Sequence, residues 1–403
     1  MKRYEKYKPS GIDWIGEVPE HWEQCRFKNF IQLITKPSNS LVKIGLENIE
    51  SGSGCFIQTD SEFEGSGVEF LKNDVVYGKL RPYLQKVWLA SFDGNAVGDF
   101  FVFRVKSNSN ATYLKYLLLS DGFTREADGA TFGAKMPRVS SDFIMTLRYF
   151  LPPLAEQEAI AAYLDARCAD IDKVVATQQK RIALLQELKQ SEITQAVTRG
   201  LNPEARMKDS GVEWIGMVPE HWEKCRFKDF ITLVTKPSLS ETKIGLENIE
   251  SGTGRFIETD SEFEGNGVEF VENDVVYGKL RPYLQKVWLA TFKGNAVGDF
   301  FVFREKKNSC SHYLKYLLLS DGFTKEADGA TVGAKMPRVS SDFILTMRYY
   351  LPNRDEQVEI AEYLDRRCGE IDKQIGAVTK QIELLREYKQ ALITEVVTGK
   401  RKV

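Results

Sequence analysis

The chain consists of one unit that occurs twice, with a shift of 200 residues and no gap, so that Trp14 recurs as Trp214. Of the 140 positions from 11 to 150, 112 are identical to the position 200 residues later. From 151 to 200, only 25 of 50 positions are identical. A period this long excludes a solenoid or a propeller and predicts two domain-sized copies. Such a chain presents the same surface twice, which favours a target with two equivalent parts.

The composition is that of an ordinary globular protein. Over 403 residues, 42% are hydrophobic and 28% are charged, which predicts two compact domains and their connections. No apolar run approaches the roughly 18 residues that span a bilayer, and the first residues lack the apolar core of a signal peptide. The six cysteines form no Cys-x-x-Cys pair, which favours reduced thiols in a cytoplasmic protein that has no membrane partner.

Charge is distributed unevenly along each copy. The net charge of −2 gives no support for nucleic-acid binding by the chain as a whole. The stretch 47–74 carries seven acidic residues and one lysine, whereas the run 77–88 carries Lys79, Arg81 and Lys86 without an acid. This segregation allows a local basic face on a protein that is neutral overall.

Each copy has two parts. The first part, about 11–150, contains short β-branched or aromatic runs separated by glycine-rich breaks, a stretch with helical spacing at 110–120, and a helix-capping motif at 140–142. It therefore predicts a mixed domain. Its tryptophans, Trp14, Trp22 and Trp88, are better explained as core residues than as platforms for stacking bases, because their neighbours are apolar.

The second part, 154 to about 197, predicts one long helix. No proline or glycine interrupts 155–196, so the helix would be about 60 Å long. Proline before it and Gly200 after it are start and stop signals. Its apolar residues follow a 4-3 spacing that requires a partner helix. The predicted seam consists of Leu164, Ile171, Val175, Ile182 and Leu185 in the first helix and of Leu364, Ile371, Ile375, Ile382 and Leu385 in the second.

The two helices most simply pair with each other, in antiparallel orientation. The short connection 200–211 leads directly into the second mixed domain instead of returning along the first helix. Antiparallel pairing would place the two domains about 60 Å apart around a pseudo-twofold axis. The fold class is therefore α/β of the α+β type. The expected order is a first mixed domain (1–150), a first spacer helix (151–200), a second mixed domain (201–350) and a second spacer helix (351–403).

Motifs for catalysis are missing from the sequence. It has no phosphate-binding Gly-x4-Gly-Lys-Ser/Thr loop, no Gly-x-Gly-x-x-Gly and no His-Glu-x-x-His. Three histidines and six scattered cysteines show no metal-ligand spacing. The segment 151–154 lacks the residues that flank the Pro-Pro of a base-methylation motif. The sequence therefore predicts a protein without catalytic residues, metal or cofactor.

Two basic segments are candidates for DNA binding. In 79–88, alternation would place Lys79 and Arg81 on one face of an extended strand, which suits phosphates and guanine edges. The alternative is a solvated strand edge protected by lysines. In 133–140, Lys135 and Arg138 precede a helix cap and could clamp a phosphate. The alternative is an ordinary exposed loop. The candidate DNA-binding residues are Lys79, Arg81, Lys86, Lys135, Arg138, Lys279, Arg281, Lys286, Lys335 and Arg338.

Several further motifs occur in each copy, and in the first copy they lie at 10–16, 18–22, 44–49, 77–84, 136–140 and 151–157. In this combination they resemble the specificity subunit of type I restriction-modification systems, and the likeness covers nearly the whole chain twice. The resemblance implies two target-recognition domains on an antiparallel helical spacer, each reading one half of a bipartite site in double-stranded DNA. It also implies that the helices dock two methyltransferase subunits and that a restriction subunit can join them. S-adenosylmethionine, ATP and Mg²⁺ would then belong to those partners.

This chain departs from the family in one respect. The two recognition domains of such subunits usually differ strongly, whereas here they are nearly identical. Two similar reading surfaces related by a twofold axis should prefer the same bases on opposite strands, so we expect an interrupted palindrome as the target. The family resemblance implies adenine as the methylated base.

Two other classes of function remain open. A two-headed protein-binding adaptor could use the acidic stretch 47–74 and would show no salt-sensitive DNA binding. A fused nuclease or methyltransferase would turn over DNA on its own, and the missing motifs argue against it.

Overall fold

The computed structural model describes residues 3–38, 40–238 and 240–403. The chain divides into two compact units, one comprising Met1–Gln179 together with Lys380–Val403 and the other comprising Lys180–Thr379. The four consecutive segments expected from the sequence differ from these units, because each unit contains parts of both long helices. Among the described residues, no helix is long and apolar enough to cross a membrane.

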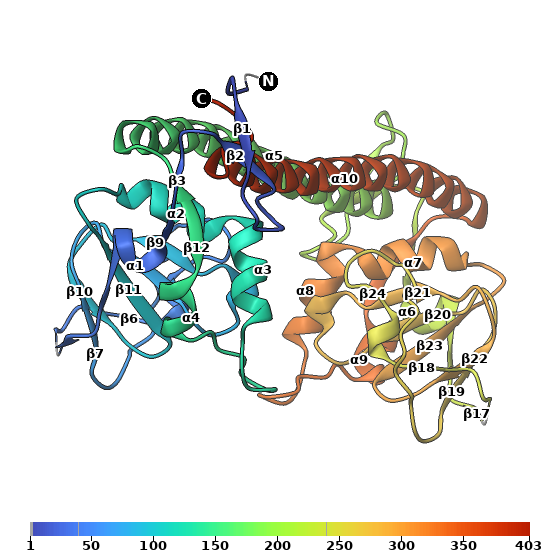
Figure 1. Ribbon diagram of the computed structural model, residues 1–403. Coiled ribbons are helices and arrows are strands. Elements are labelled where there is room, and N and C mark those ends of the chain that lie inside the picture. The colour runs from blue at the N-terminus through green and yellow to red at the C-terminus, as the bar shows by residue number, and fades with distance from the viewer. Residues whose placement is uncertain (1–2, 39, 239) are drawn as a thin grey trace. The chain divides into compact units, whose positions relative to one another are not determined.

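The first unit contains a mixed domain and segments of both long helices (Figure 1). Its strands are β1 (Tyr7–Pro9), β2 (Glu17–Pro19), β3 (Glu23–Arg26), β4 (Ile31–Ile34), β5 (Pro37–Ser38), β6 (Lys43–Ile44), β7 (Gly67–Phe70), β8 (Val75–Gly78), β9 (Val87–Leu89), β10 (Gly94–Ala96), β11 (Phe100–Val105) and β12 (Arg148–Leu151). Its helices are α1 (Phe27–Phe30), η1 (Leu46–Asn48), η2 (Pro82–Leu84), α2 (Ala111–Leu119), α3 (Asp121–Gly129), α4 (Ser141–Thr146) and the first part of α5 (Leu154–Arg199).

The second unit repeats these elements. Its strands are β13 (Met207–Asp209), β14 (Met217–Pro219), β15 (Glu223–Arg226), β16 (Ile231–Val234), β17 (Pro237–Ser238), β18 (Lys243–Ile244), β19 (Gly267–Phe270), β20 (Val275–Gly278), β21 (Val287–Leu289), β22 (Gly294–Ala296), β23 (Phe300–Glu305) and β24 (Arg348–Leu351). Its helices are α6 (Phe227–Phe230), η3 (Leu246–Asn248), η4 (Pro282–Leu284), α7 (Ser311–Leu319), α8 (Asp321–Gly329), α9 (Ser341–Thr346) and the first part of α10 (Arg354–Val397).

Two four-stranded sheets form the centre of each mixed domain. In the first unit their orders are β4-β11-β8-β9, which is antiparallel throughout, and β5-β7-β10-β6, in which β10 and β6 run parallel. Side chains alternate between the two faces of β8. Val76 points into a core shared with Trp88, whereas Val75 and Tyr77 join a second core with α2 and α3. Both faces of this sheet are therefore buried.

The tryptophans confirm most of the core assignment. Trp22 and Trp88 are fully or almost fully buried, as are their counterparts Trp222 and Trp288. Trp14 is only partly buried and stacks on Tyr149 with ring centroids 6.3 Å apart. The predicted stretch at 110–120 is a helix, and the Ser140 side chain caps α4 by accepting a hydrogen bond from the Phe143 amide.

Segments of α5 and α10 pair antiparallel inside each unit. In the first unit, Lys389 donates to Asp172 at 2.7 Å, and Gly399 lies beside Trp22, whose indole donates to Glu156 at the start of α5. In the second unit, Lys189 contacts Asp372 at 2.9 Å. The antiparallel orientation expected from the sequence is thus present in each unit.

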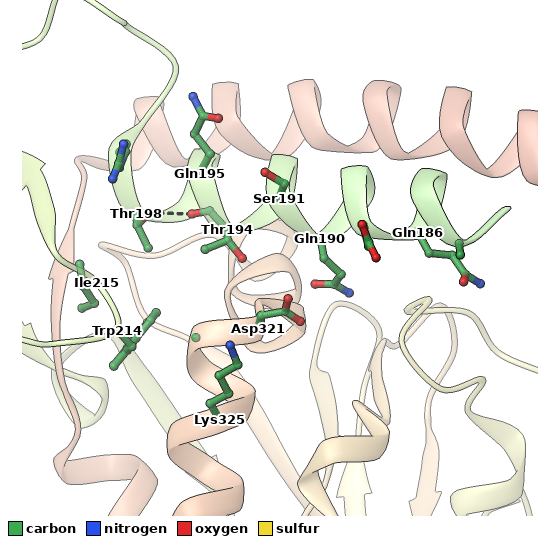
Figure 2. A pocket seen from close by; sticks show the side chains of 14 residues that line it. Gln186, Gln190, Ser191, Thr194, Gln195, Thr198, Trp214, Ile215, Asp321 and Lys325 are labelled. Atoms are coloured by element: carbon green, nitrogen blue, oxygen red, sulfur yellow. Dashed lines mark hydrogen bonds between the residues drawn. The ribbon is translucent and has the colours of Figure 1, made fainter. Parts of the chain in front are cut away.

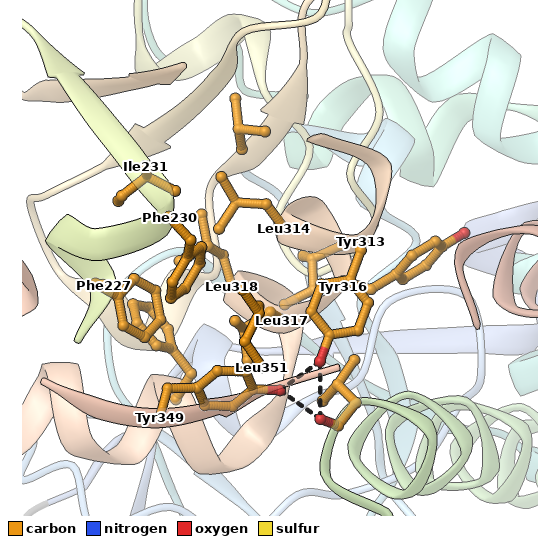
Figure 3. Packing of buried hydrophobic residues seen from close by; sticks show 14 of the residues in the cluster. Phe227, Phe230, Ile231, Tyr313, Leu314, Tyr316, Leu317, Leu318, Tyr349 and Leu351 are labelled. Carbon is orange, nitrogen blue, oxygen red and sulfur yellow. Dashed lines mark hydrogen bonds between the residues drawn. The ribbon is translucent and has the colours of Figure 1, made fainter. Parts of the chain in front are cut away.

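The end of each long helix is buried in a mixed domain. In the second unit, the Tyr313 hydroxyl donates to the Val197 carbonyl at 3.1 Å, and Tyr349 donates to the same oxygen (Figure 3). Carbonyls in the last turn of a helix have no partner within the helix, so the two phenols satisfy one of them. Tyr113 and Tyr149 hold Val397 in the same way in the first unit.

The predicted seam lies along the paired faces of the helices. Its positions fall into a buried group and a half-buried group. The buried group is Leu164, Ile171, Leu364, Ile371 and Ile382, and the half-buried group is Val175, Ile182, Leu185, Ile375 and Leu385. Gly200 adopts a φ of +71° just after α5, which is the left-handed geometry that ends many helices.

Candidate nucleic-acid interface

The basic segment that begins at Lys79 is a loop and a turn. The prediction of an extended strand was wrong, because β8 ends at Gly78 and Pro82 starts the short helix η2. Arg81, with φ +51°, adopts the left-handed region, and its amide donates to the Pro137 carbonyl at 2.8 Å. A left-handed conformation is costly for a residue with a side chain and is kept only when the surroundings impose it. The second copy repeats it, with φ +51° at Arg281.

The loop of Arg81 lies against a second loop, between α3 and α4. Leu80 and Phe132 each form a β-bridge with Arg138. The amides and carbonyls of Phe132 and Arg138 pair in both directions, at 2.9 and 3.0 Å, so that 132–138 is a closed hairpin. This loop projects from the mixed domain on the side opposite the long helix (Figure 1). The structure thus brings together the two basic segments that the sequence proposed separately.

An ion cluster fixes the base of these loops. Arg138 forms a bidentate pair with Asp99 at 2.8 and 2.9 Å, and the Lys79 amine lies 3.9 Å from the same carboxylate. The hydrogen bonds from Arg138 lower the pKa of Asp99, so the carboxylate stays charged. Lys279, Arg338 and Asp299 repeat the arrangement. Lys79 and Arg138 are therefore partly neutralised and position the loops.

Lys86 is engaged inside its own domain. Its amine donates to the carbonyls of Leu46 and Ile49 at 2.8 and 2.7 Å, and desolvation lowers its pKa. Lys286 likewise donates to the Ile249 carbonyl at 2.6 Å. Both amines hold the segment of η1 or η3 next to the start of β9 or β21. This geometry favours a structural role for Lys86 and Lys286, and their predicted contact with DNA stays a prediction.

Arg81 and Lys135 are the basic residues of this surface that point into solvent. Both are exposed, and among the described residues neither has an acidic partner within ion-pair distance. In the second copy, Arg281 and Lys335 are also exposed, and the Arg281 guanidinium donates to the Lys335 carbonyl at 3.5 Å. These four residues remain the best placed of the predicted set.

One feature of this surface was not predicted from the sequence. Asp99 orients Arg138, and it is 39 residues away in the chain. The repeat was the available signal, because Asp99 recurs unchanged as Asp299. Tyr83, the aromatic residue that follows Lys79 and Arg81 in the basic segment, is 53% exposed.

The second unit also contains a pocket that is separate from these loops. It occupies about 880 Å³ between α5 and α8 and is lined by Gln190, Thr194, Trp214, Asp321 and Lys325 among others (Figure 2). Its lining mixes acidic, basic and amide groups and includes none of the predicted DNA-binding residues. Within the described part of the chain, no group of three or more His, Cys, Asp or Glu side chains could hold a metal ion.

Comparisons with known proteins point to one family. No family model matches the chain. It is 25% identical to the type I restriction enzyme MjaVIII specificity subunit of Methanocaldococcus jannaschii, over 96% of this chain and 94% of that protein. It is 24% identical to the EcoDI specificity subunit of Escherichia coli, over 66% of this chain and 65% of that protein.

Solved structures share the fold. A chain from a study of complex assembly in the type I R-M system superposes with a TM-score of 0.73 and 16% identity, covering 94% of this chain and 98% of that one. The HsdS subunit of Thermoanaerobacter tengcongensis gives a TM-score of 0.53 at 18% identity, covering 95% and 98%. The chain is therefore similar in sequence to type I restriction enzyme specificity subunits, and it shares the fold of the solved structures, with two similar mixed domains and two long helices.

Proposed function

We propose that this chain is the non-catalytic DNA-recognition subunit of a type I restriction-modification complex. The observation that carries the proposal is the repeated pair of loops, in which Arg81 and Lys135 in one unit and Arg281 and Lys335 in the other are exposed and free of acidic partners among the described residues. Exposed arginine and lysine on a projecting loop suit phosphates and the edges of bases in a groove. The adaptor alternative finds no support among the relatives, which are specificity subunits.

The proposed target is an interrupted palindrome in double-stranded DNA. Both units present the same exposed loop cations and the same backbone geometry, so each should prefer nearly the same half-site. If the two domains approach DNA around a twofold axis, as expected from the sequence, the half-sites lie on opposite strands. One half-site, a gap of unspecified bases and its reverse complement would follow.

We propose that partner subunits carry out methylation and cleavage. Two methyltransferase subunits would bind along the helices, and restriction subunits can join them. S-adenosylmethionine, ATP and Mg²⁺ would be bound by these partners, and the complex would act in the cytoplasm, where the DNA lies.

Salt-dependent binding tests the proposal. The full chain should bind a pool of duplexes, selected from random sequence, with an affinity that falls as salt rises. Replacing Arg81 and Arg281 together by alanine should weaken the binding of the selected duplexes by about 1–3 kcal/mol for each base contact. It should also reduce the base preference at one position of each half-site. The double variant Lys28→Ala with Lys228→Ala, which removes exposed lysines near β3 and β15, is the control and should leave both readouts unchanged. Equal affinity and equal preference in the arginine variant would contradict the assignment.

A further inference from the structure

The projecting hairpin carries exposed apolar side chains, Phe132 in the pair that closes it and Met136 in its turn. Phe132 is 61% exposed and Met136 is 49% exposed, and in the second copy Val332 is 79% and Met336 is 49% exposed. Apolar surface is unfavourable in water and gains free energy when a partner covers it. Because these side chains stand outside both hydrophobic cores of their unit, packing within the domain does not account for them.

The hairpin 132–138 is held in a fixed geometry. The backbone pairs of Phe132 and Arg138 close the hairpin, and Gly133, with φ +95°, makes its turn. The hydrogen bond from the Arg81 amide to Pro137 and the ion pair of Arg138 with Asp99 attach it to the domain. A loop restrained in this way loses little conformational entropy on binding, so the contacts of its side chains can contribute to affinity and specificity.

The charges next to these apolar side chains indicate which kind of partner covers them. Lys135 lies between Phe132 and Met136 in the hairpin, and Arg81 lies on the adjoining loop; both cations are exposed. Cations that flank apolar side chains suit DNA, because the cations can bind phosphates while the apolar groups pack against base edges such as the thymine methyl. An apolar protein surface would gain nothing from these two exposed cations.

The hairpin also contains a difference between the copies. From 131 to 140, nine of ten residues are identical, and the exception is Phe132 against Val332. We propose, on the basis of the DNA-recognition function above, that this residue contacts bases and determines specificity. Phenylalanine and valine at the same place on the same hairpin would give the two half-sites unequal preferences at one corresponding position.

Residue exchange between the copies tests the inference. The full chain and its variants are incubated with duplexes whose half-sites are random, and the bound duplexes are sequenced. The wild-type consensus should be a palindrome with one unequal position, at which base preferences of the two halves differ by roughly fivefold or more. Phe132→Val should make both halves equal to the valine half, and Val332→Phe should make both equal to the phenylalanine half.

The double variant gives the most specific test, because it exchanges the two residues between the copies. Phe132→Val combined with Val332→Phe should restore the wild-type consensus, because a duplex can be read from either strand. Leu71→Val is the matched control, since this exposed leucine is Val271 in the second copy and lies away from the hairpin. It should leave the consensus unchanged.

The outcomes separate the two proposals. If the wild-type chain selects no duplex, the proposed function fails. If it selects a bipartite site that is the same for wild type, Phe132→Val and Val332→Phe, recognition of DNA stands and the role of residue 132 is overturned. Because the exchanged side chains are exposed, all variants should have the same melting temperature. A variant with a changed melting temperature would indicate a structural effect of the exchange.

Discussion

The mixed domains and the long helices of this chain have diverged differently. In the helices, 25 of the 50 positions from 151 to 200 are shared between the copies. The buried Leu164 and Ile171 are among them, whereas the exposed Val174 and Ala183 have changed, to Gln374 and Glu383. In the mixed domains, 112 of 140 positions are shared, and the exposed loop residues Arg81, Tyr83, Lys135 and Met136 recur unchanged. The two units therefore present nearly the same loop surface twice, whereas their helices have diverged further.

The largest expected effect concerns the helix seam. Ile371 is 1% exposed, so Ile371→Asp would bury a charge without a partner and should cost several kcal/mol in the free energy of unfolding. Ile375→Asp should cost less, because Ile375 is only half-buried. Chemical denaturation measures both, and Lys373→Asp, on the exposed face, is the control. Equal midpoints for Ile371→Asp and the control would show that this face is not packed.

A smaller loss of unfolding free energy is expected when the ion pairs between the helices are broken. Lys189 and Lys389 are nearly buried, and each depends on one aspartate. Asp372→Asn would leave Lys189 without its counter-charge and should cost about 2 kcal/mol. Asp172 is about half exposed, so water screens its ion pair with Lys389 more strongly, and Asp172→Asn should cost less. The order of the two unfolding midpoints is the readout; a reversed order would contradict the burial argument.

Two lysines of the same domain should behave in opposite ways. Lys135→Ala should reduce the slope of log affinity against log salt by about one and leave stability unchanged. Lys86→Met should lower stability, because two backbone carbonyls lose their donor, and leave the slope unchanged. Anisotropy titrations and thermal melts on both variants distinguish the roles. If Lys86→Met reduced the slope of log affinity against log salt, the predicted contact of Lys86 with DNA would be supported.

The smallest effect depends on pH. The folded-state pKa of Asp99 is lowered by Arg138, so their pairing stabilises the fold above the unfolded-state pKa of about 3.9. That stability is lost as pH falls through the folded-state value. The difference in melting temperature between wild type and Asp99→Asn should therefore be present at neutral pH and shrink below about pH 4. A difference that is constant with pH would indicate that the ion pair contributes nothing.

The sequence was sufficient for features that depend on spacing along the chain. The 4-3 pattern and the flanking proline and glycine predicted a helix from 154 to about 197, and α5 spans Leu154–Arg199. The orientation of the helices followed from the short connection after Gly200. These predictions succeed because residues three and four apart share a helix face whatever the rest of the fold does.

Features that depend on contacts between distant segments were less accessible. The alternation of Lys79 and Arg81 resembled a strand, but Pro82 and the bond from Arg81 to Pro137 impose a turn. Three basic residues of one segment take different roles because Asp99 neutralises one and backbone carbonyls hold another. Neither partner can be inferred from spacing, since each lies tens of residues away.

Methylome sequencing tests the central claim most directly. A cell that expresses this chain with a methyltransferase subunit would be sequenced for modified bases. Two units with the same reading surface predict one interrupted palindrome, methylated once on each strand, with at most one position that differs between its halves. Two unrelated half-sites, or a direct repeat, would contradict the inference from the repeated surface to a symmetric target.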